Sequence, residues 1–122
     1  MSARRILLVD DDKTVLAYMQ AKLGKRYELA VTSAPQDVAR LARERPPELI
    51  ICDVEMPGMD GGDVSASIFL DDAIRHIPVL FLTSLVTPED LARLQGQLGG
   101  RPAVSKRAPL AELVQRIEAL LA

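Results

Sequence analysis

The sequence predicts a doubly wound α/β domain, in which a parallel sheet of five strands is covered by five helices on its two faces. Short apolar runs of strand length alternate five times with longer segments whose apolar residues recur at helical spacing. Because right-handed crossovers between parallel strands place helices on either face, this alternation covers both sides of the sheet. The chain has 122 residues, so we expect a single domain over residues 1–122, with no effector domain in this chain.

The composition excludes several other classes of protein. Apolar residues make up 48% and charged residues 26% of the chain, a balance typical of a folded globular domain. The net charge is −2 and no basic run is present, so we expect no direct binding to nucleic acid. The apolar runs are too short to cross a bilayer, and we expect no membrane partner. The single cysteine, Cys52, excludes an internal disulfide and fits a reducing, cytoplasmic location.

The first third of the chain predicts two strands and the helix between them. The apolar run at residues 6–9 predicts a strand, and residues 13–23 predict a helix because apolar residues recur four apart. We expect Gly24 to end this helix in the left-handed conformation. Apolar and polar residues alternate over residues 27–31, which predicts a strand with one wetter face, at the edge of the sheet.

The middle of the chain predicts two helices on either side of a buried strand. Residues 33–36 match a capping box with a proline in the first turn, which predicts a helix as far as Glu44, before two prolines. Residues 49–52 are all apolar and predict a fully buried strand. A turn-rich segment over residues 56–62 then leads to a helix predicted around residues 64–72.

The last third predicts two strands, each followed by a helix. Residues 79–82 predict a strand, and residues 87–90 begin a helix with a cap, a first-turn proline and two acids. Three glycines between residues 96 and 100 disfavour helix, so we expect this helix to be short or mobile. Residues 103–105 predict a marginal last strand, and residues 110–121 carry the clearest amphipathic helix.

Polar residues gather where the predicted strands end. Asp10 and Asp11 follow the first strand, Asp53 the third, Thr83 the fourth and Lys106 the fifth. In open parallel sheets, ligands bind beyond the carboxyl ends of the strands, where the strand order reverses. In a flavodoxin-like 2-1-3-4-5 order the first and third strands are neighbours. We therefore expect the three aspartates to meet.

Three clustered carboxylates indicate a bound cation, because like charges resist ionisation unless a cation neutralises them. Oxygen ligands without histidine or thiolate favour Mg²⁺, which takes one or two carboxylates together with a phosphate oxygen. A phosphoryl group at this site could be contacted by the hydroxyl of Thr83 and the ammonium of Lys106. An aspartate can accept such a group as an acyl phosphate, and the central acid is Asp53.

These residues lie in three segments that resemble the motifs of response-regulator receiver domains of two-component signalling. The segments are residues 7–12 (LLVDDD), 50–61 (IICDVEMPGMDG) and 79–83 (VLFLT). The resemblance extends over essentially the whole chain. The loop sequence MPGMDG after the third strand is its most specific part.

The resemblance implies a phosphorylation-dependent signalling function in which Asp53 is the phosphoacceptor, and Thr83 and Lys106 hold the phosphoryl oxygens. The Mg²⁺ ligands that it implies are Asp10, Asp11, Asp53 and the backbone carbonyl of Glu55. The donor would be a phosphohistidine on a histidine kinase or a histidine phosphotransfer protein. The chain would catalyse only its own phosphorylation and dephosphorylation, and would signal through altered binding of a downstream protein along its fourth helix, fifth strand and fifth helix.

The sequence departs from the family pattern at two places, and a third residue bears on the lifetime of the phosphate. The proline that usually follows the fifth-strand lysine is replaced by Arg107, so we expect a trans peptide after Lys106. Ala103 stands where the family commonly has an aromatic residue, which implies that signals pass through the segment 83–94 instead. Leu85 occupies a position that tunes hydrolysis of the acyl phosphate, and an apolar residue there favours a longer-lived phosphate.

Other interpretations of the acidic residues remain open at this point. Residues 10–14 also fit the Asp-x-Asp-x-Thr motif of haloacid-dehalogenase phosphatases, with Asp10 as nucleophile and Asp12 as the second acid. That interpretation leaves Asp53 and its loop unexplained, and the family's later acidic pair should follow Lys106. The acids could also merely cap the next helix, which needs at most two of them. A receiver-like scaffold that is never phosphorylated is the third possibility, suggested by Ala103.

Overall fold

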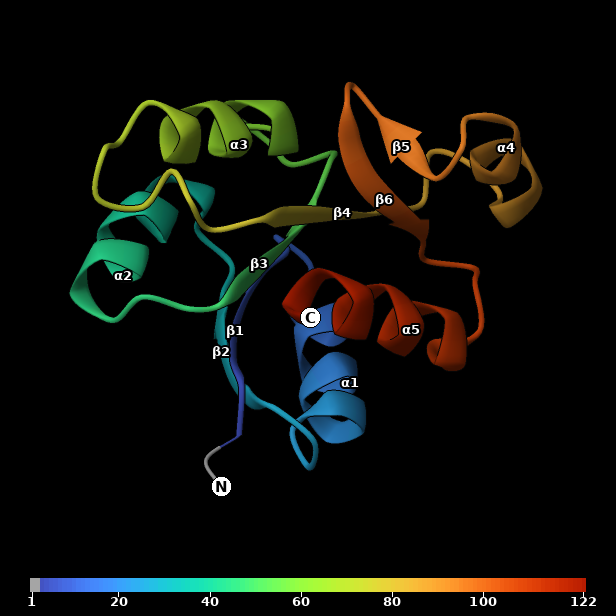
Figure 1. Cartoon of the computed structure of the whole chain (residues 1–122), viewed down its shortest axis with the longest axis horizontal. Helices are drawn as coiled ribbons and strands as arrows, with labels where there is room; N and C mark the ends of the chain where they lie inside the picture. The colour runs from blue at the N-terminus through green and yellow to red at the C-terminus, as the bar shows by residue number, and fades with distance from the viewer. Residues whose placement is uncertain (1–2) are drawn as a thin grey trace.

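The computed structural model describes residues 3–122 as a twisted sheet with helices on both faces (Figure 1). The strands are β1 (Arg5–Val9), β2 (Glu28–Thr32), β3 (Leu49–Asp53), β4 (Val79–Thr83), β5 (Gln97–Leu98) and β6 (Arg101–Ser105). The helices are α1 (Lys13–Leu23), α2 (Val38–Glu44), α3 (Gly61–Phe69), α4 (Pro88–Arg93) and α5 (Leu110–Leu121), with a 3-10 turn, η1 (Pro35–Asp37), before α2. The doubly wound α/β fold is confirmed.

The strand order is β2-β1-β3-β4-β6-β5, and every pair except β5 with β6 is parallel. The five parallel strands therefore have the predicted 2-1-3-4-5 order, with β2 at one edge. Every residue of β3 is buried, as expected for the central strand. In the register of β1 with β3, Val9 pairs with Cys52, so both strands end at the same edge of the sheet.

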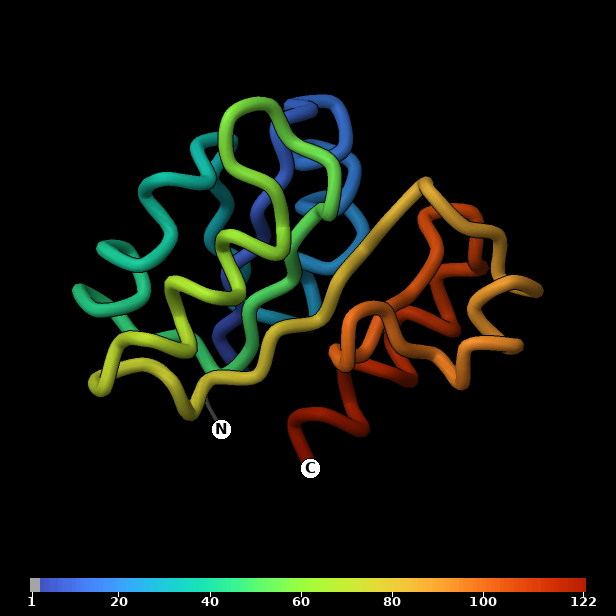
Figure 2. The backbone as a smooth tube through the Cα atoms, turned by 90° about the horizontal axis from the view of Figure 1, so that it is seen from above, coloured from blue at the N-terminus to red at the C-terminus, as the bar shows by residue number. Residues whose placement is uncertain are grey.

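Two apolar cores form because successive residues of each strand face opposite sides of the sheet. On β3, Ile50 packs in the core that includes residues of α2 and α3, and Ile51 packs in the core that includes residues of α1 and α5. Figure 1 shows these helix pairs on opposite sides of the strands. Figure 2 shows α2 and α4 at opposite ends of the molecule.

The predicted end of the first helix and the predicted start of the second helix differ from the structure. Gly24 follows α1 with φ −65°, so it continues a right-handed turn rather than forming a left-handed stop. The capping box at residues 33–36 does not form. Instead Pro35–Asp37 make a 3-10 turn whose cap position, Ala34, has no side chain that could accept a hydrogen bond. The predicted end at Glu44 is confirmed.

The third helix is displaced from its predicted position around residues 64–72. Helix α3 begins at Gly61 because Asp60 and Asp63 form a reciprocal capping box. Asp60 Oδ1 accepts the Asp63 N–H at 2.8 Å, and Asp63 Oδ2 accepts the Asp60 N–H at 3.1 Å. The helix ends at Phe69, and the side chain of Asp71 accepts the N–H of Ala73 at 3.0 Å to start a separate turn.

A short antiparallel hairpin of β5 and β6 was not predicted. Helix α4 has only six residues, in agreement with the short helix expected there. The glycines that weaken the helix then reverse the chain, since Gly96, Gly99 and Gly100 all have positive φ angles. The two residues of β5 pair with Arg101 and Pro102 and extend the sheet by one edge strand.

Candidate functional site

The three aspartates predicted to meet lie together at the carboxyl end of the sheet. Asp10 follows β1, Asp53 ends β3, and one carboxylate oxygen from each of Asp10, Asp11 and Asp53 lies within 4.8 Å of the others. Asp10 and Asp53 are buried, whereas Asp11 is exposed. The adjacency of β1 and β3 therefore brings together residues that are far apart in the sequence.

Lys106 reaches this cluster from the end of β6. Its Nζ donates a hydrogen bond to Asp10 Oδ2 at 2.7 Å and lies 3.4 Å from Asp53 Oδ1. Burial disfavours the charged ammonium, but the hydrogen bond to Asp10 and the charges of both aspartates outweigh it and raise the pKa of Lys106. The lysine is therefore a cation shared by the two buried carboxylates.

The environment of Asp53 makes its carboxylate harder to ionise than an exposed one. Burial raises the pKa of Asp53, and the negative charge of Asp10 raises it further. Lys106 and the backbone N–H of Val54 act in the opposite direction, but the net shift is upward. Any additional positive charge at this site would stabilise the ionised form of Asp53.

Thr83 lies at the end of β4 and is fully buried. Its Oγ1 accepts the N–H of Leu85 at 3.0 Å, and its carbonyl accepts the N–H of Lys106 at 2.7 Å. The strand-end threonine and lysine are thus linked through the backbone. This arrangement fixes the positions of the loops that follow β4 and β6.

Ser105 is a positioning residue that the sequence interpretation missed. Its buried hydroxyl donates to the carbonyl of Val86 at 2.8 Å and accepts the N–H of Arg107 at 3.1 Å. It therefore joins the loop after β4 to the loop after β6. A hydroxyl residue directly before Lys106, at the end of an apolar strand, was the available signal.

Asp12 and Glu55 lie outside the carboxylate cluster. Asp12 caps α1 by accepting the N–H of Thr14 at 2.9 Å, and its own N–H donates to Asp10 Oδ1 at 2.9 Å. Helix capping thus accounts for Asp12, the residue that the phosphatase interpretation requires as its second acid. The side chain of Glu55 is exposed in the loop after β3.

The loop after β3 is held close to the site by a required glycine. The N–H of Gly61 donates to the carbonyl of Val54 at 2.9 Å, and a Cβ at position 61 would lie 2.6 Å from the carbonyl oxygen of Asp53. A larger residue would therefore displace the loop.

Cys52 is buried next to Asp53. Burial, together with the charges of Asp53 and Asp10, raises the pKa of its thiol to about 12, as expected for a core residue.

The peptide bonds of residues 3–122 are all trans, so the expectation for the bond after Lys106 is confirmed. Within the same residues, no helix is long and apolar enough to cross a membrane.

A comparison with models of known protein families identifies the family of this chain. Residues 6–118 match the model of the response regulator receiver domain. The chain belongs to this family. The receiver resemblance and its two-component signalling context are therefore confirmed.

Several response regulators are similar to this receiver domain. It is 41% identical over 102 residues to the response regulator PleD of Caulobacter vibrioides, covering 82% of this chain and 22% of PleD. It is 33% identical over 123 residues to the transcriptional regulatory protein PrrA of Mycobacterium tuberculosis, covering 99% of this chain and 51% of PrrA. The receiver domain thus spans between about a fifth and about half of the length of these relatives.

Other similar proteins have nearly the same length as this receiver domain. The polar-differentiation response regulator DivK of Brucella anthropi is 27% identical over 119 residues, covering 97% of this chain and 96% of DivK. A crystal structure of a putative response regulator from Chloroflexus aurantiacus superposes with a TM-score of 0.82 at 26% identity, covering 98% of each chain. The signal receiver domain of a histidine kinase from Syntrophus aciditrophicus gives 0.80 at 29% identity, covering 98% of this chain and 90% of that one.

Membership of this family gives the general function of the chain. Receiver domains of response regulators act in phosphorylation-dependent signalling and are phosphorylated by histidine kinases. Receiver domains also bind Mg²⁺ at an acidic pocket, and the cluster of Asp10, Asp11 and Asp53 is compatible with such a site. All three supply hard oxygen ligands, which suit this ion.

Proposed function

We propose that this receiver domain accepts a phosphoryl group on Asp53 from a phosphohistidine of a partner protein. The observation that carries the proposal is the position of Asp53, a buried carboxylate beside both Asp10 and Lys106 at the end of the central strand. A nucleophilic carboxylate must be ionised and must meet the phosphorus in line with the leaving group. Lys106 supports the ionised form, and the rigid end of β3 supports the alignment.

The carboxylates of Asp10, Asp11 and Asp53, with the backbone carbonyl of Glu55, would hold Mg²⁺. When bound, this ion supplies positive charge that stabilises the phosphoryl oxygens during transfer. Two of the three carboxylates are buried, so the protein holds them in place before any ligand arrives. Asp11 is exposed and can adjust to the ion.

In the proposed transfer, a carboxylate oxygen of Asp53 attacks the phosphorus of the phosphohistidine. The new O–P bond forms as the P–N bond breaks, and the imidazole leaves with the electron pair of that bond. The hydroxyl of Thr83 donates to one phosphoryl oxygen, and the ammonium of Lys106 pairs with another. The chain's own contribution is therefore mainly positioning and neutralisation of charge.

The partner that supplies the phosphoryl group would be a histidine kinase or a histidine phosphotransfer protein, acting in the cytoplasm. We propose that the output is altered binding of a downstream protein, with no direct contact to nucleic acid or membrane. The side chain of Leu85 is apolar and exposed, and it would restrict the access of water to an acyl phosphate on Asp53. We therefore also propose that this acyl phosphate is long-lived.

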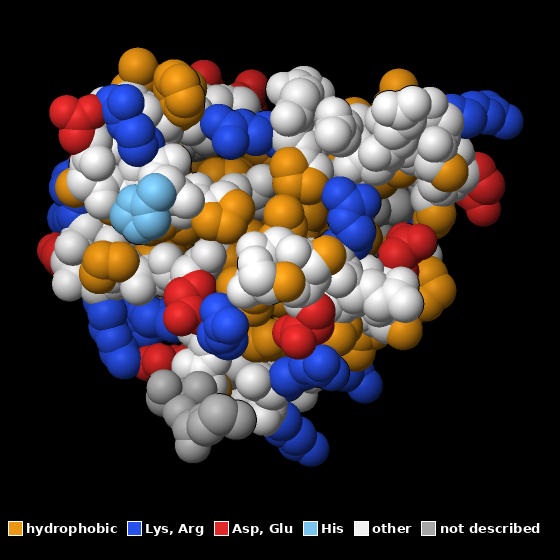
Figure 3. All heavy atoms as spheres, viewed as in Figure 1, with side chains coloured by type: hydrophobic (Ala, Val, Ile, Leu, Met, Phe, Trp, Pro, Cys, Tyr) orange, Lys and Arg blue, Asp and Glu red, His pale blue; other side chains and the backbone are white. Residues whose placement is uncertain are grey.

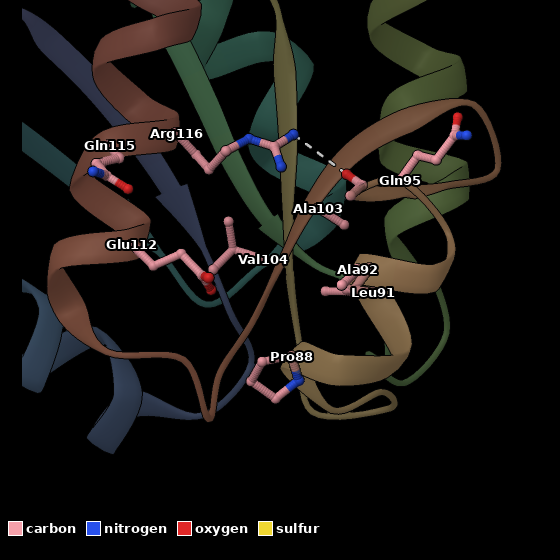
Figure 4. Close-up of a pocket in the computed structure, with 10 residues that line it drawn as sticks. Pro88, Leu91, Ala92, Gln95, Ala103, Val104, Glu112, Gln115 and Arg116 are labelled. Carbon is pink, nitrogen blue, oxygen red and sulfur yellow. Dashed lines mark hydrogen bonds between the residues drawn. The ribbon is translucent and has the colours of Figure 1, made fainter.

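The output surface is proposed along α4, β6 and α5. A cavity of about 320 Å³ lies there, lined by residues that include Leu91, Ala103 and Glu112 (Figure 4). Ala103 is too small to fill this space. Arg116 reaches across from α5, and its guanidinium donates to the carbonyl of Gly96 at 3.3 Å. Movement in the segment 83–94 would change the shape of this surface.

The intact mass of the protein tests the proposal after incubation with Mg²⁺ and acetyl phosphate. We expect the wild-type chain to gain the mass of one phosphoryl group and Asp53→Asn to gain none. Asp12→Asn is the matched control and should be modified like the wild type, because Asp12 lies outside the cluster. An unmodified wild type would support a receiver-like scaffold. Equal modification of Asp53→Asn would place the acceptor elsewhere.

A further inference from the structure

Lys106 is a largely buried lysine with two close contacts. Figure 3 shows lysine and arginine side chains that project into solvent on one face of the molecule. Only 20% of the Lys106 side chain is exposed, and its Nζ lies 2.7 Å from Asp10 Oδ2 and 3.4 Å from Asp53 Oδ1. A lysine loses much rotamer freedom when it is ordered in this way. The protein must therefore fix the backbone from which this side chain extends.

A hydrogen-bonded turn holds the backbone of Lys106, and Ser105 closes this turn twice. The carbonyl of Ser105 accepts the N–H of Ala108 at 3.0 Å, and its hydroxyl accepts the N–H of Arg107 at 3.1 Å. Lys106 is thus the second residue of a four-residue turn. Because residue 107 is arginine rather than proline, its backbone carries the N–H that donates to this hydroxyl.

The same hydroxyl also fixes the turn against the loop after β4. It donates to the carbonyl of Val86 at 2.8 Å, and Ser105 is only 1% exposed. Thr83 and Ser105 are partners in the register of β4 with β6, and the carbonyl of Thr83 accepts the N–H of Lys106 at 2.7 Å. One buried side chain therefore sets the spacing between the turn that carries Lys106 and the loop that follows Thr83.

This spacing matters because Lys106 and Thr83 are the two side chains proposed to hold the phosphoryl oxygens. The ammonium stands at the end of a flexible stem, so a small rotation of the backbone moves it by more than a hydrogen bond tolerates. Without the Ser105 hydroxyl, the N–H of Arg107 and the carbonyl of Val86 would lose their partner, and the turn would relax. A misplacement of about 1 Å can slow a reaction about a hundredfold.

We propose that Ser105 is a positioning residue for phosphoryl transfer, which holds the Lys106 ammonium against Asp10 and Asp53 through the turn at residues 105–108. This role rests on the proposed phosphorylation of Asp53 and adds to it a residue that controls its rate. The hydrogen bonds of the Ser105 side chain go to backbone groups of the two loops, so the serine acts through Lys106.

The mobility of the Lys106 ammonium tests the positioning without any phosphoryl transfer. Nitrogen-15 relaxation of the lysine ammonium groups, measured in a chelator, gives an order parameter for each group. We expect Lys106 to be ordered in the wild type, much less ordered in Ser105→Ala, and ordered again in Ser105→Thr, which keeps the hydroxyl. Ser65→Ala is the matched control, because it also removes a buried serine hydroxyl but lies on α3. Lys22 is exposed and should be mobile in every variant.

The rate of phosphorylation tests the consequence for the reaction. With Mg²⁺ and acetyl phosphate, Ser105→Ala should be modified at least about tenfold more slowly than the wild type, whereas Ser105→Thr and Ser65→Ala should keep most of the rate. In a Lys106→Met background, adding Ser105→Ala should change the rate by less than about twofold, because the group that it positions is gone. Urea unfolding of each variant checks that it is folded under the conditions of the assay.

The outcomes separate this proposal from the proposed function. An equally ordered Lys106 in the wild type and in Ser105→Ala would overturn the positioning role, whether or not the chain is phosphorylated. Independent losses of rate from Ser105→Ala and Lys106→Met would also overturn it and leave Ser105 a purely structural residue. A wild type that takes up no phosphoryl group would contradict the proposed function instead, and the order parameters would still decide whether Ser105 positions Lys106.

Discussion

Lys106 sets the charge of the acidic site. Three carboxylates meet there, and the single ammonium of Lys106 contacts two of them, at 2.7 Å and 3.4 Å. With all three carboxylates ionised, three negative charges and one positive charge leave two negative charges at the edge of the sheet. A divalent cation would neutralise this remainder, which is a physical reason for the site to take Mg²⁺ rather than a monovalent ion.

Replacing Asp11 separates metal binding from folding. Asp11→Asn should weaken Mg²⁺ binding by at least about tenfold, because a charged ligand is lost. Its side chain is exposed, so the free energy of unfolding in a chelator should stay within about 0.5 kcal/mol of the wild type. Isothermal titration calorimetry with Mg²⁺ measures the affinity. Asp12→Asn is the control and should bind Mg²⁺ nearly as well, since asparagine also caps helices. Equal losses in both variants would contradict the proposed ligands.

Among the elements, Tyr27 joins the start of β2 to helix α5. Its hydroxyl donates to Glu118 Oε2 at 2.5 Å, across 91 positions of sequence. Burial, followed by the hydrogen bond and negative charge of Glu118, raises the pKa of Tyr27 to about 12. Arg26 also contacts Glu118, but this ion pair is exposed and contributes little. The tyrosine is therefore the main polar link between these two elements.

This link predicts a loss of stability in alkaline solution. The unfolded chain ionises Tyr27 near pH 10, whereas the folded chain keeps the proton until about pH 12. Its contribution is thus complete below pH 10 and is lost as the pH rises from 10 to 12. Tyr27→Phe should lower the free energy of unfolding by about 1 kcal/mol at neutral pH. It should also reduce the loss of stability between pH 10 and pH 12. Urea unfolding at several pH values measures both effects. The exposed Tyr18→Phe should behave like the wild type, and an unchanged decline in Tyr27→Phe would contradict the link.

The hairpin of β5 and β6 depends on glycines with different surroundings. Gly96 has φ +71°, and a Cβ there would lie 2.5 Å from the guanidinium of Arg116. Gly99 has φ +56°, and nothing lies within 4 Å of its Cβ position. Both positions need the left-handed conformation, but only Gly96 also leaves room for another side chain.

Replacing each of these two glycines by alanine should therefore reduce the stability by different amounts. Gly99→Ala should cost about 1 kcal/mol, the usual penalty for a left-handed alanine. Gly96→Ala should cost more, about 2 kcal/mol, since the Arg116 side chain must also move away from the Gly96 carbonyl. Urea midpoints of the two variants give the comparison. A larger loss in Gly99→Ala would show that the contact with Arg116 is unimportant.

In the whole molecule, one sheet supports two cores. Ile50 and Ile51 are both fully buried neighbours on β3, yet each packs in a different core. Because the central strand belongs to both cores, loss of packing on one face weakens the support of the other. The chain should therefore unfold as one cooperative unit.

Variants of these two residues test this cooperativity. Ile50→Ala and Ile51→Ala should each reduce the free energy of unfolding by about 2–5 kcal/mol, and Ile→Val at the same sites by about 0.5–1.5 kcal/mol. Unfolding followed by far-ultraviolet circular dichroism and by tyrosine fluorescence should give coincident curves for all four variants. Separate transitions in either alanine variant would show that the two cores unfold independently.

The sequence correctly predicted the order of the parallel strands and the meeting of Asp10, Asp11 and Asp53. The all-apolar β3 and the half-polar β2 have distinct patterns because one strand is buried on both faces and the other lies at an edge. Local capping was harder to predict. The residues at 33–36 match a capping box that does not form, whereas Asp60 and Asp63 form one that was overlooked. Several polar residues near a helix start compete for the same N–H groups, and only the path of the chain decides between them.

By itself, the sequence determined the alternation of strands and helices, and with it the edge at which Asp10, Asp53, Thr83 and Lys106 gather. Local apolar periodicity specifies these features because each element must bury one face or both. Only the tertiary structure decided that Lys106 binds Asp10, that Ser105 ties two loops together and that the glycines build a hairpin. These contacts join residues distant in sequence, or depend on backbone conformation, and no local pattern encodes them.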